Sequence, residues 1–378
     1  MVSVATVVCN VKRYLAEAIE SILNQTFRDF EFIIVDFGST DGSRSIITRY
    51  QAKDNRIQFH VIPPCNLSEA RNACCFRARG KYLALLDADD VALPDRLARQ
   101  VEYLENHPGI AILGGAVELI DESGRRFGAS GTRQSDPEIR RTLPTFSPFV
   151  VSTVTMRSGE FRAAGGYRRA FDDAGEDYDL WLRMMERCQA ANLGEVVARY
   201  RIHAGQMWGR NLRKGCTGHC VARASAEMRG RGEADPVDSV DSLTPELLSE
   251  LGLGREEVDA YTLAGYVTCV ICALRANAGP SILTLVNDML ELLDHSKSVR
   301  HSIAAEAWFT AARAYWHRGD IKAACAAMTR AFLIHPLFVT EIPWRGIRRA
   351  ARGLMQSSAS PLTFSLMKKN GRPHSGSH

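Results

Sequence analysis

The sequence contains no hydrophobic run long enough to cross a bilayer, and no basic segment precedes its first apolar residues. We therefore expect neither a membrane-spanning helix nor a signal peptide. The formal net charge is only +4 over 378 residues, which is too small to indicate a nucleic acid as the partner. These absences predict a cytoplasmic protein that binds no nucleic acid and is long enough for two domains.

A zinc site is not expected either, although the chain has ten cysteines. Cys216 and Cys220 flank His219 with a metal-like spacing, but no second pair of ligands accompanies them. Cys269 and Cys272 lie in an apolar run that is typical of a buried helix. Because no export signal is present, we expect the cysteines to be reduced thiols.

What the chain does contain is an apolar stretch that ends in carboxylates, at residues 81–90. Tyr82 to Leu86 are apolar without alternation, which is typical of a strand covered on both faces of a parallel sheet. In extended chain, Asp87 and Asp89 point to the same side and Asp90 points away. Two carboxylates at the carboxyl end of such a strand suit Mg2+ or Mn2+, with substrate phosphates completing the shell. The alternative is that these acids only cap the following helix.

Strands and helices alternate along the first hundred residues. Apolar runs predict strands, and apolar residues at helical spacing predict the helices between them. The expected strands are residues 2–8, 32–35, 57–62 and 82–86, followed later by 110–120, 150–156 and 196–202. This order predicts an α/β domain with a mostly parallel sheet and helices on both faces.

A second acidic cluster occupies residues 172–179, immediately before a helical apolar pattern. Acids in a first helical turn complement the helix dipole, which is the structural interpretation of Glu176 and Asp179. Trp181 follows in helical register with two methionines, which favours a place in the core over stacking on a ligand.

Taken together, these phrases resemble a family 2 glycosyltransferase of the GT-A fold, a Rossmann-like α/β domain, over about the first two hundred residues. The matching phrases are Cys9-Asn10, 21–27, Val35-Asp36 with Gly38–Gly42, Ala70-Arg71-Asn72, Leu86–Asp90 with Pro94-Asp95, and Gly175–Trp181.

The resemblance implies roles for both acidic clusters. Asp89, with Asp87 beside it, would hold Mn2+ or Mg2+ on the diphosphate of a nucleotide-sugar donor. Alternatively, Asp87 would bind the ribose of the donor nucleotide instead of the cation. Asp177 would be the general base that takes the proton from the acceptor hydroxyl, and one in-line attack would invert the anomeric centre.

Other residues are implied in binding. The donor pocket would be lined by Asp36, by Arg71 and His203 near the phosphates, and by the end of the first strand (Val7, Val8, Cys9 and Asn10). Glu176 and Trp181 would lie on the acceptor side. The alternatives are a surface arginine for Arg71 and a structural histidine for His203.

Two departures from the family pattern keep a second hypothesis open. The family often has an acid where this chain has Phe37, and a tyrosine before the asparagine where it has Cys9. Both changes favour a catalytically silent sugar-nucleotide-binding scaffold. A third hypothesis, a glycosidase with two catalytic carboxylates, needs no metal, and the placement of Asp87 and Asp89 opposes it.

The expected domains are residues 1–205 for the GT-A domain, 206–244 for a closing loop and linker anchored by Trp208, and 245–340 for an all-α region. Residues 305–336 match a tetratricopeptide repeat, through Trp308, Ala312, Tyr315, Gly319, Ala324, Ala331 and Pro336. Such helices either dock a protein partner or a second copy of the chain, or only cap the catalytic domain.

Residues 341–378 form a basic tail with interleaved apolar residues. Such a tail either contacts an anionic membrane peripherally, where lipid-linked acceptors reside, or forms a frayed end. Overall, the sequence predicts a metal-dependent, inverting glycosyltransferase that uses a glycan or lipid-linked acceptor in cell-surface polysaccharide or lipopolysaccharide synthesis.

Overall fold

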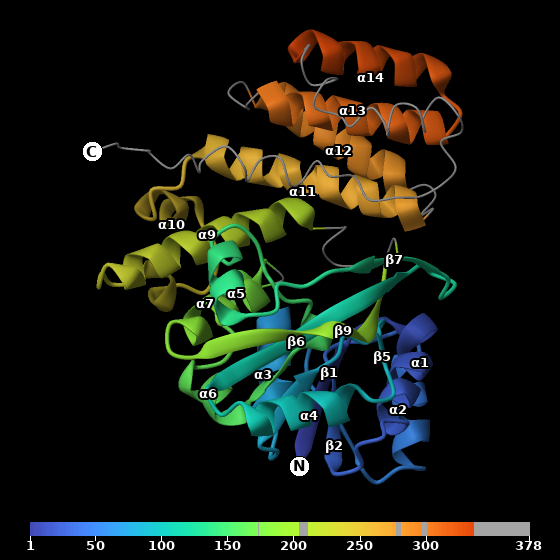
Figure 1. The fold of residues 1–378 in the computed structure, drawn as a ribbon, viewed down its shortest axis with the longest axis vertical. Helices are drawn as coiled ribbons and strands as arrows, with labels where there is room; N and C mark the ends of the chain where they lie inside the picture. The colour runs from blue at the N-terminus through green and yellow to red at the C-terminus, as the bar shows by residue number, and fades with distance from the viewer. Residues whose placement is uncertain (173, 204–210, 277–280, 297–300, 336–378) are drawn as a thin grey trace, which may run out of the picture. The chain divides into compact units, whose positions relative to one another are not determined.

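A computed structural model describes residues 1–172, 174–203, 211–276, 281–296 and 301–335 (Figure 1). Trp208 and the basic tail lie outside these residues. The strands are β1 (Val2–Val8), β2 (Phe30–Asp36), β3 (Ile57–Val61), β4 (Tyr82–Leu85), β5 (Val91–Ala92), β6 (Ile110–Ile120), β7 (Arg126–Ser130), β8 (Thr155–Arg157) and β9 (Gln189–Arg201). The helices before β9 are α1 (Lys12–Leu23), α2 (Ser43–Gln51), α3 (Leu67–Cys75), α4 (Arg96–Asn106), α5 (Asp136–Thr142), α6 (Ser158–Ala163) and α7 (Glu176–Met185), with 3-10 turns η1 (Val151–Thr153) and η2 (Arg169–Phe171).

The strands form one mixed sheet in the order β3-β2-β1-β4-β8-β6-β9-β5, and β7 pairs with β6. The first four strands are parallel, as the alternating pattern predicts. β8 then runs antiparallel to both β4 and β6, while β6 and β9 are parallel to each other. The predicted α/β class with helices on both faces is confirmed, and its sheet is mixed, parallel from β3 to β4 and with antiparallel pairings beyond β4. The segment predicted as a strand at 150–156 is instead a 3-10 turn followed by the short β8.

Apolar side chains cover both faces of the sheet, which explains why apolar and polar residues do not alternate along its strands. Along β2, Phe32 and Ile34 face a cluster that includes Leu15 and Ile19 of α1, while Ile33 and Val35 face the cluster that contains Trp181. Each such aliphatic side chain, when fully buried, contributes about 1.5–3 kcal/mol to stability. The carboxyl ends of β1, β2 and β4 are thereby fixed at one edge of the sheet.

The segment predicted as a loop and linker, 206–244, instead contains a long helix. α9 spans Leu212–Gly230, and the turn η3 (Pro236–Ser239) follows it. The buried face of α9 is made of small residues, which include Gly218, Ala222, Ala224 and Ser225. Small residues let a helix approach its neighbour closely but leave no stripe of large apolar residues in the sequence. The linker prediction was wrong for this reason.

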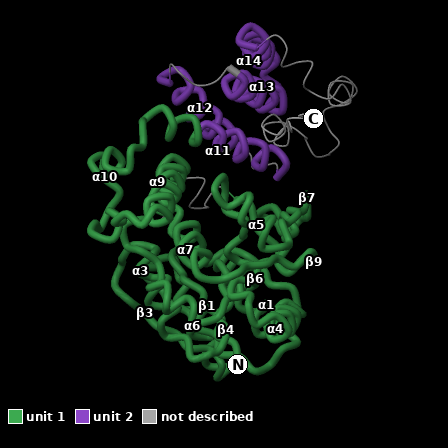
Figure 2. The backbone as a smooth tube through the Cα atoms, turned by 60° about the vertical axis from the view of Figure 1, so that its left-hand side comes forward, with its two compact units in different colours: residues 1–262 green, residues 263–378 purple. Residues whose placement is uncertain are grey.

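The chain divides into two compact units, residues 1–262 and 263–378 (Figure 2). The first therefore includes α9 and α10 (Pro245–Glu250), and the division falls within α11 (Arg255–Ala276). By length and composition α11 could cross a membrane, with a mean hydropathy of 1.3 in a window that is 50% buried. The expectation that no stretch meets this criterion was wrong, although the core helix of a soluble protein meets it too.

The second unit contains α12 (Ser281–His295), α13 (His301–His317) and α14 (Ile321–Ile334). Gly319, with φ of 81°, turns the chain between α13 and α14, and Asp320 caps α14 through the backbone N–H of Ala323. Ala324, Ala327 and Ala331 are buried on one face of α14, whereas Ile321 and Phe332 are exposed. A helical C-terminal region is confirmed. Its assignment as a tetratricopeptide repeat and its role in binding a partner or a second copy stay predictions.

Candidate functional site

The carboxylates after β4 lie in a turn, and each has a different partner. The turn is closed by a hydrogen bond from the backbone N–H of Asp90 to the carbonyl of Asp87, 3.2 Å long. Asp90 is fully buried and its Oδ1 accepts from the backbone N–H of Arg201 at 2.8 Å. The extended geometry expected for residues 87–90 was therefore wrong, although Asp90 does point away from the surface. It does not cap a helix, since α4 begins only at Arg96.

Asp89 is paired with an imidazole from the end of β9. Its Oδ2 lies 2.9 Å from Nε2 of His203, and both side chains are largely buried. Arg201 supports this pair, because its Nε donates to the carbonyl of Asp89 at 2.8 Å. The predicted residues Asp89 and His203 are thus brought together. Arg201 therefore supports this pair from the end of β9.

Asp87 is paired instead with Arg71 of α3. The guanidinium NH2 donates to Oδ1 of Asp87 at 3.1 Å, and the hydroxyl of Ser152 accepts from the Asp87 backbone N–H at 3.0 Å. Burial raises the pKa of Asp87; the Arg71 charge opposes that shift and the neighbouring Asp89 adds to it. A cation beside these two carboxylates would relieve their repulsion.

Arg71 also reaches the second acidic cluster. Its Nε lies 3.2 Å from Oε1 of Glu176, the first residue of α7, and its guanidinium lies 5.9 Å from the centroid of the Tyr167 ring. α3 holds Arg71 in place through a capping box between Asn66 and Glu69. One buried arginine therefore joins the carboxyl end of β4 to the start of α7, and the alternative of a surface arginine is excluded.

The residues predicted at the start of α7 separate into different environments. Asp177 is half-buried, whereas Glu176 is buried against Arg71. Asp179 is fully buried and bonds with Arg168 and Arg183, so it serves the structure. Trp181 is also fully buried, with its ring edge-on to Phe149 at 5.7 Å. The core position favoured for Trp181 is therefore confirmed, because helical register carries the ring into the core, and the acceptor-side role that the resemblance implied does not fit a fully buried ring.

The residues that follow β1 are hydrogen-bonded to the loop that follows β2. Asn10, at a positive φ of 53°, accepts from the backbone N–H of Thr40 at 2.8 Å through its Oδ1. Asp36 is fully buried, and its Oδ1 accepts from Arg44 and from the backbone of the following loop. Of the predicted pocket residues here, Cys9 and Asn10 are exposed and Val7 is half-buried. Val8 is fully buried in the core, so its side chain cannot line a pocket.

Helix α9 covers the start of α7, which the sequence reading missed. A Cβ on Gly218 would lie 1.5 Å from the carbonyl oxygen of Ala174, and one on Gly175 would lie 2.4 Å from the His219 ring. The sequence carried one signal of this contact, the pair Gly218-His219. It lies between Cys216 and Cys220, whose spacing resembles an incomplete metal site. The structure shows Cys216 and Cys220 buried in this helix, where burial raises the pKa of each thiol to about 12 and about 11.

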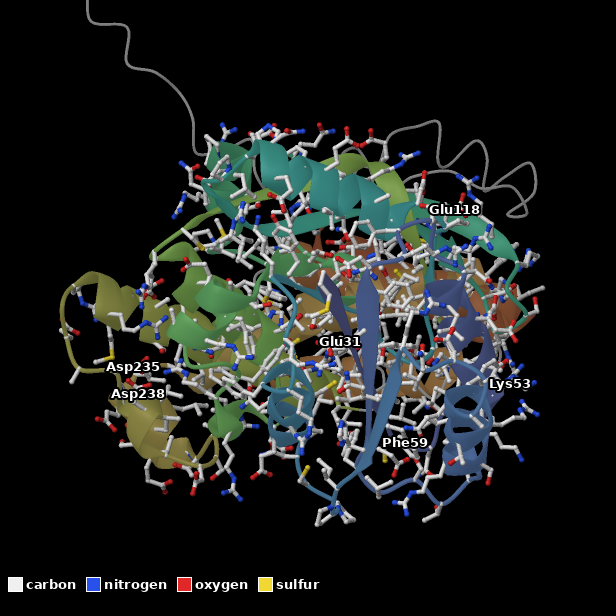
Figure 3. All side chains as sticks on the ribbon, turned by 90° about the horizontal axis from the view of Figure 1, so that it is seen from below. Glu31, Lys53, Phe59, Glu118, Asp235 and Asp238 are labelled. Atoms are coloured by element: carbon white, nitrogen blue, oxygen red, sulfur yellow. The ribbon has the colours of Figure 1, made fainter. Side chains whose placement is uncertain are left out.

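A charged network fixes α9 and η3 to α7. Arg168 bonds with Asp179 and, at 2.7 Å and 3.0 Å, with Asp235 and Asp238, the pair labelled in Figure 3. Burial tends to raise the pKa of Asp235, but the hydrogen bond from Ser225 and the Arg168 charge lower it to about 2. Asp235 is thus ionised at neutral pH and holds the covering helix in place.

The residues after β4 fit a divalent cation if a bound substrate supplies the remaining coordinating atoms. Within the described ranges, no three His, Cys, Asp or Glu side chains converge into a ready-made metal site. Asp89 and His203 offer a carboxylate oxygen and an imidazole nitrogen, with Asp87 beside them. Such a partial set is typical of Mg2+ and Mn2+ sites in which substrate phosphates supply the remaining ligands.

Two comparisons identify relatives of the chain. Residues 3–166 match the model of Glycosyl transferase family 2. The putative glycosyltransferase EpsE of Bacillus subtilis is 37% identical over 207 residues, which are 53% of this chain and 72% of that protein. The O-antigen biosynthesis glycosyltransferase WbnJ of Escherichia coli is 32% identical over 207 residues, 54% of this chain and 80% of that protein.

Among solved structures, Staphylococcus aureus TarS 1-349 in complex with UDP-GlcNAc aligns with a TM-score of 0.48 at 15% identity, over 87% of this chain and 90% of that one. This likeness is too weak to support an argument about function. The two curated relatives are more than 30% identical to this chain, are each covered over more than two thirds of their length, and are named as glycosyltransferases. The chain therefore belongs to glycosyl transferase family 2 and is a glycosyltransferase.

Proposed function

We propose that this protein transfers a sugar from a nucleotide-sugar donor to a hydroxyl acceptor with inversion of the anomeric centre. The observation that carries the proposal is Arg71, which binds Asp87 on one side and Glu176 on the other. It thereby holds the carboxyl end of β4, where a cation would bind the donor diphosphate, close to the start of α7, which carries Asp177. An in-line displacement needs this juxtaposition of a leaving-group site and a base.

On the donor side, Asp89 and His203 would hold Mn2+ or Mg2+, and Arg71 would add a positive charge near the phosphates. A divalent cation there would supply Lewis-acid stabilisation of the departing diphosphate. Asp87 orients Arg71 or contacts the ribose. The exposed Cys9 and Asn10 and the loop shaped by Asp36 would border the nucleotide.

On the acceptor side, Asp177 would take the proton from the attacking hydroxyl. It is half-buried at the first turn of α7, where the helix dipole favours the ionised carboxylate. Glu176 does not face an acceptor; it holds Arg71. Asp177 is therefore the one acid in the first turn of α7 that is neither bonded to an arginine nor fully buried.

The acceptor class is inferred from relatives. Besides WbnJ, a relative from Erwinia amylovora is named for amylovoran biosynthesis and is 30% identical over 192 residues. These names support a role in assembling a surface polysaccharide. A lipid-linked acceptor, peripheral membrane contact and a cytoplasmic location stay predictions.

The silent scaffold remains the second hypothesis because Phe37 and Cys9 stand where the family often has an acid and a tyrosine. A thermal-shift titration with UDP-, GDP- and dTDP-sugars, with Mn2+ and with EDTA, tests the donor site that transfer requires, and cleavage of the bound donor then separates transfer from the scaffold. At about a hundred times Kd, a ligand that binds only the folded state adds about 2.7 kcal/mol, or roughly 3–5 °C for a protein of this length. We expect such a shift with one nucleotide, dependent on the metal and absent in Asp89→Ala.

The matched control for this titration is Asp95→Ala, which removes a nearby carboxylate that pairs only with Arg99 in the described residues. It should keep the full donor-dependent shift. A folded wild-type protein with no shift for any donor would favour loss of donor binding over transfer. A shift that persists in EDTA would remove the cation from the proposal.

A further inference from the structure

His219 lies against the turn that carries Asp177, and the proposed function does not use it. Its ring stacks on Tyr178, the residue after Asp177, with centroids 4.6 Å apart and planes 28° apart. The same ring touches Gly175, the N-cap of α7, so closely that a Cβ there would lie 2.4 Å from Cδ2. The His219 ring thus packs against Gly175 and Tyr178, which lie on either side of the proposed base, Asp177, in the sequence.

A chain of two hydrogen bonds sets which nitrogen of His219 carries the proton. Tyr261 Oη donates to the carbonyl of Thr145 at 3.2 Å. A phenol has only one proton, so at its contact of 3.1 Å with Nδ1 of His219 the oxygen must accept. Nδ1 is therefore the protonated nitrogen, and the lone pair lies on Nε2.

Nε2 is the ring nitrogen on the side of Gly175, since it would lie 3.1 Å from a Cβ built there. Burial lowers the pKa of His219, and the Asp177 carboxylate opposes that shift, so the neutral ring predominates at neutral pH. The titratable groups that face the ring are Asp177 and Tyr178 from α7 and Tyr261 from α11.

We propose that His219 is a proton-relay partner of Asp177, which makes it a positioning residue for the transfer reaction. This inference rests on the proposed function. The acceptor hydroxyl gives its proton to Asp177 as its oxygen forms the bond to the anomeric carbon and the diphosphate leaves. The proton then passes from the Asp177 carboxyl to Nε2 of His219, and Asp177 returns to the carboxylate.

The resulting imidazolium keeps its Nδ1–H on Tyr261 and is stabilised by the Asp177 charge. It loses the Nε2 proton to water, which restores both groups for the next turnover. The Tyr261–Thr145 pair holds the tautomer that makes this step possible. A purely structural His219 would need neither the fixed tautomer nor a lone pair on Nε2.

The test is His219→Asn, whose side-chain amide can still donate to Tyr261 but has no counterpart of Nε2. We expect kcat to fall by about tenfold or more, with the KM for the donor unchanged and the acid limb of the pH–rate profile displaced. In His219→Ala, added imidazoles should restore activity in proportion to their basicity. Tyr261→Phe, which keeps the ring packing, should lower kcat several-fold because both tautomers become populated.

An unchanged kcat and pH profile in folded His219→Asn would overturn the relay. So would rescue of His219→Ala that is equal for imidazoles of every pKa, since that result indicates filling of a cavity. Neither result touches the proposed function, which fails instead if no donor is cleaved or if Asp177→Asn stays active. The two failures are therefore distinguishable.

Discussion

Replacing Asp177 with asparagine should remove most of the transfer activity while leaving the fold intact. Proton removal by a positioned base contributes about 10²- to 10⁴-fold to a rate, so we expect a loss of kcat in that range. The amide keeps the size of the carboxylate, and Asp177 is only half-buried, so stability should change little. Donor binding should also persist, because the proposed donor contacts lie on α3 and just after β1, β2, β4 and β9.

The control for this variant is Asp172→Asn, in the same acidic cluster. Asp172 is exposed and pairs with Lys214 at 2.8 Å, a surface contact that contributes little. It should keep the wild-type rate. Asp177→Asn with more than a tenth of the wild-type kcat would exclude Asp177 as the base and leave its role as a first-turn helix acid.

Gly218→Ala should impair both stability and transfer through the packing of α9. The new methyl group would lie 1.5 Å from the carbonyl oxygen of Ala174, a backbone atom that cannot turn away. Overpacking of this kind costs about 1–3 kcal/mol. To relieve it, α9 or the loop before α7 must move, and a displacement of about 1 Å at a catalytic group can cost about a hundredfold in rate.

Gly215→Ala is the matched control, because it adds the same methyl group to the same helix. Nothing lies within 4 Å of a Cβ at Gly215, so only helix propensity changes, by about 1 kcal/mol in favour of alanine. We expect a thermal midpoint equal to or above that of the wild type, and normal transfer. Gly218→Ala with wild-type kcat and midpoint would show that the close contact between α9 and α7 has no role in the site.

The sheet and the first acidic cluster could be predicted because their signals are local. Runs such as Phe32–Val35 have no alternation, and burial on both faces of β2 is the reason. The pairing of Asp89 with His203 was anticipated only through the family pattern. No spacing in the sequence relates residues 114 positions apart.

The rest of the site depends on packing that one sequence does not encode locally. α9 was predicted as a linker because its buried face is Gly, Ala, Ser and Cys, and these residues look like loop composition. The family resemblance implied binding roles for Val8 and Trp181, although helical spacing favoured the core for Trp181, and the pleat of β1 and the register of α7 turn both side chains into the core. His219 could not be recognised because Gly175 and Tyr261, which define its position, are distant in the chain.

The most direct test of the account follows the anomeric configuration of the sugar by proton NMR as an α-linked nucleotide sugar is consumed. The account predicts a β-configured product, formed with release of the nucleoside diphosphate, no reaction in EDTA, and a reaction at least a hundredfold slower with Asp177→Asn. An α-configured product would contradict a single in-line displacement. Donor binding without any cleavage in folded protein would identify the chain as a sugar-nucleotide scaffold.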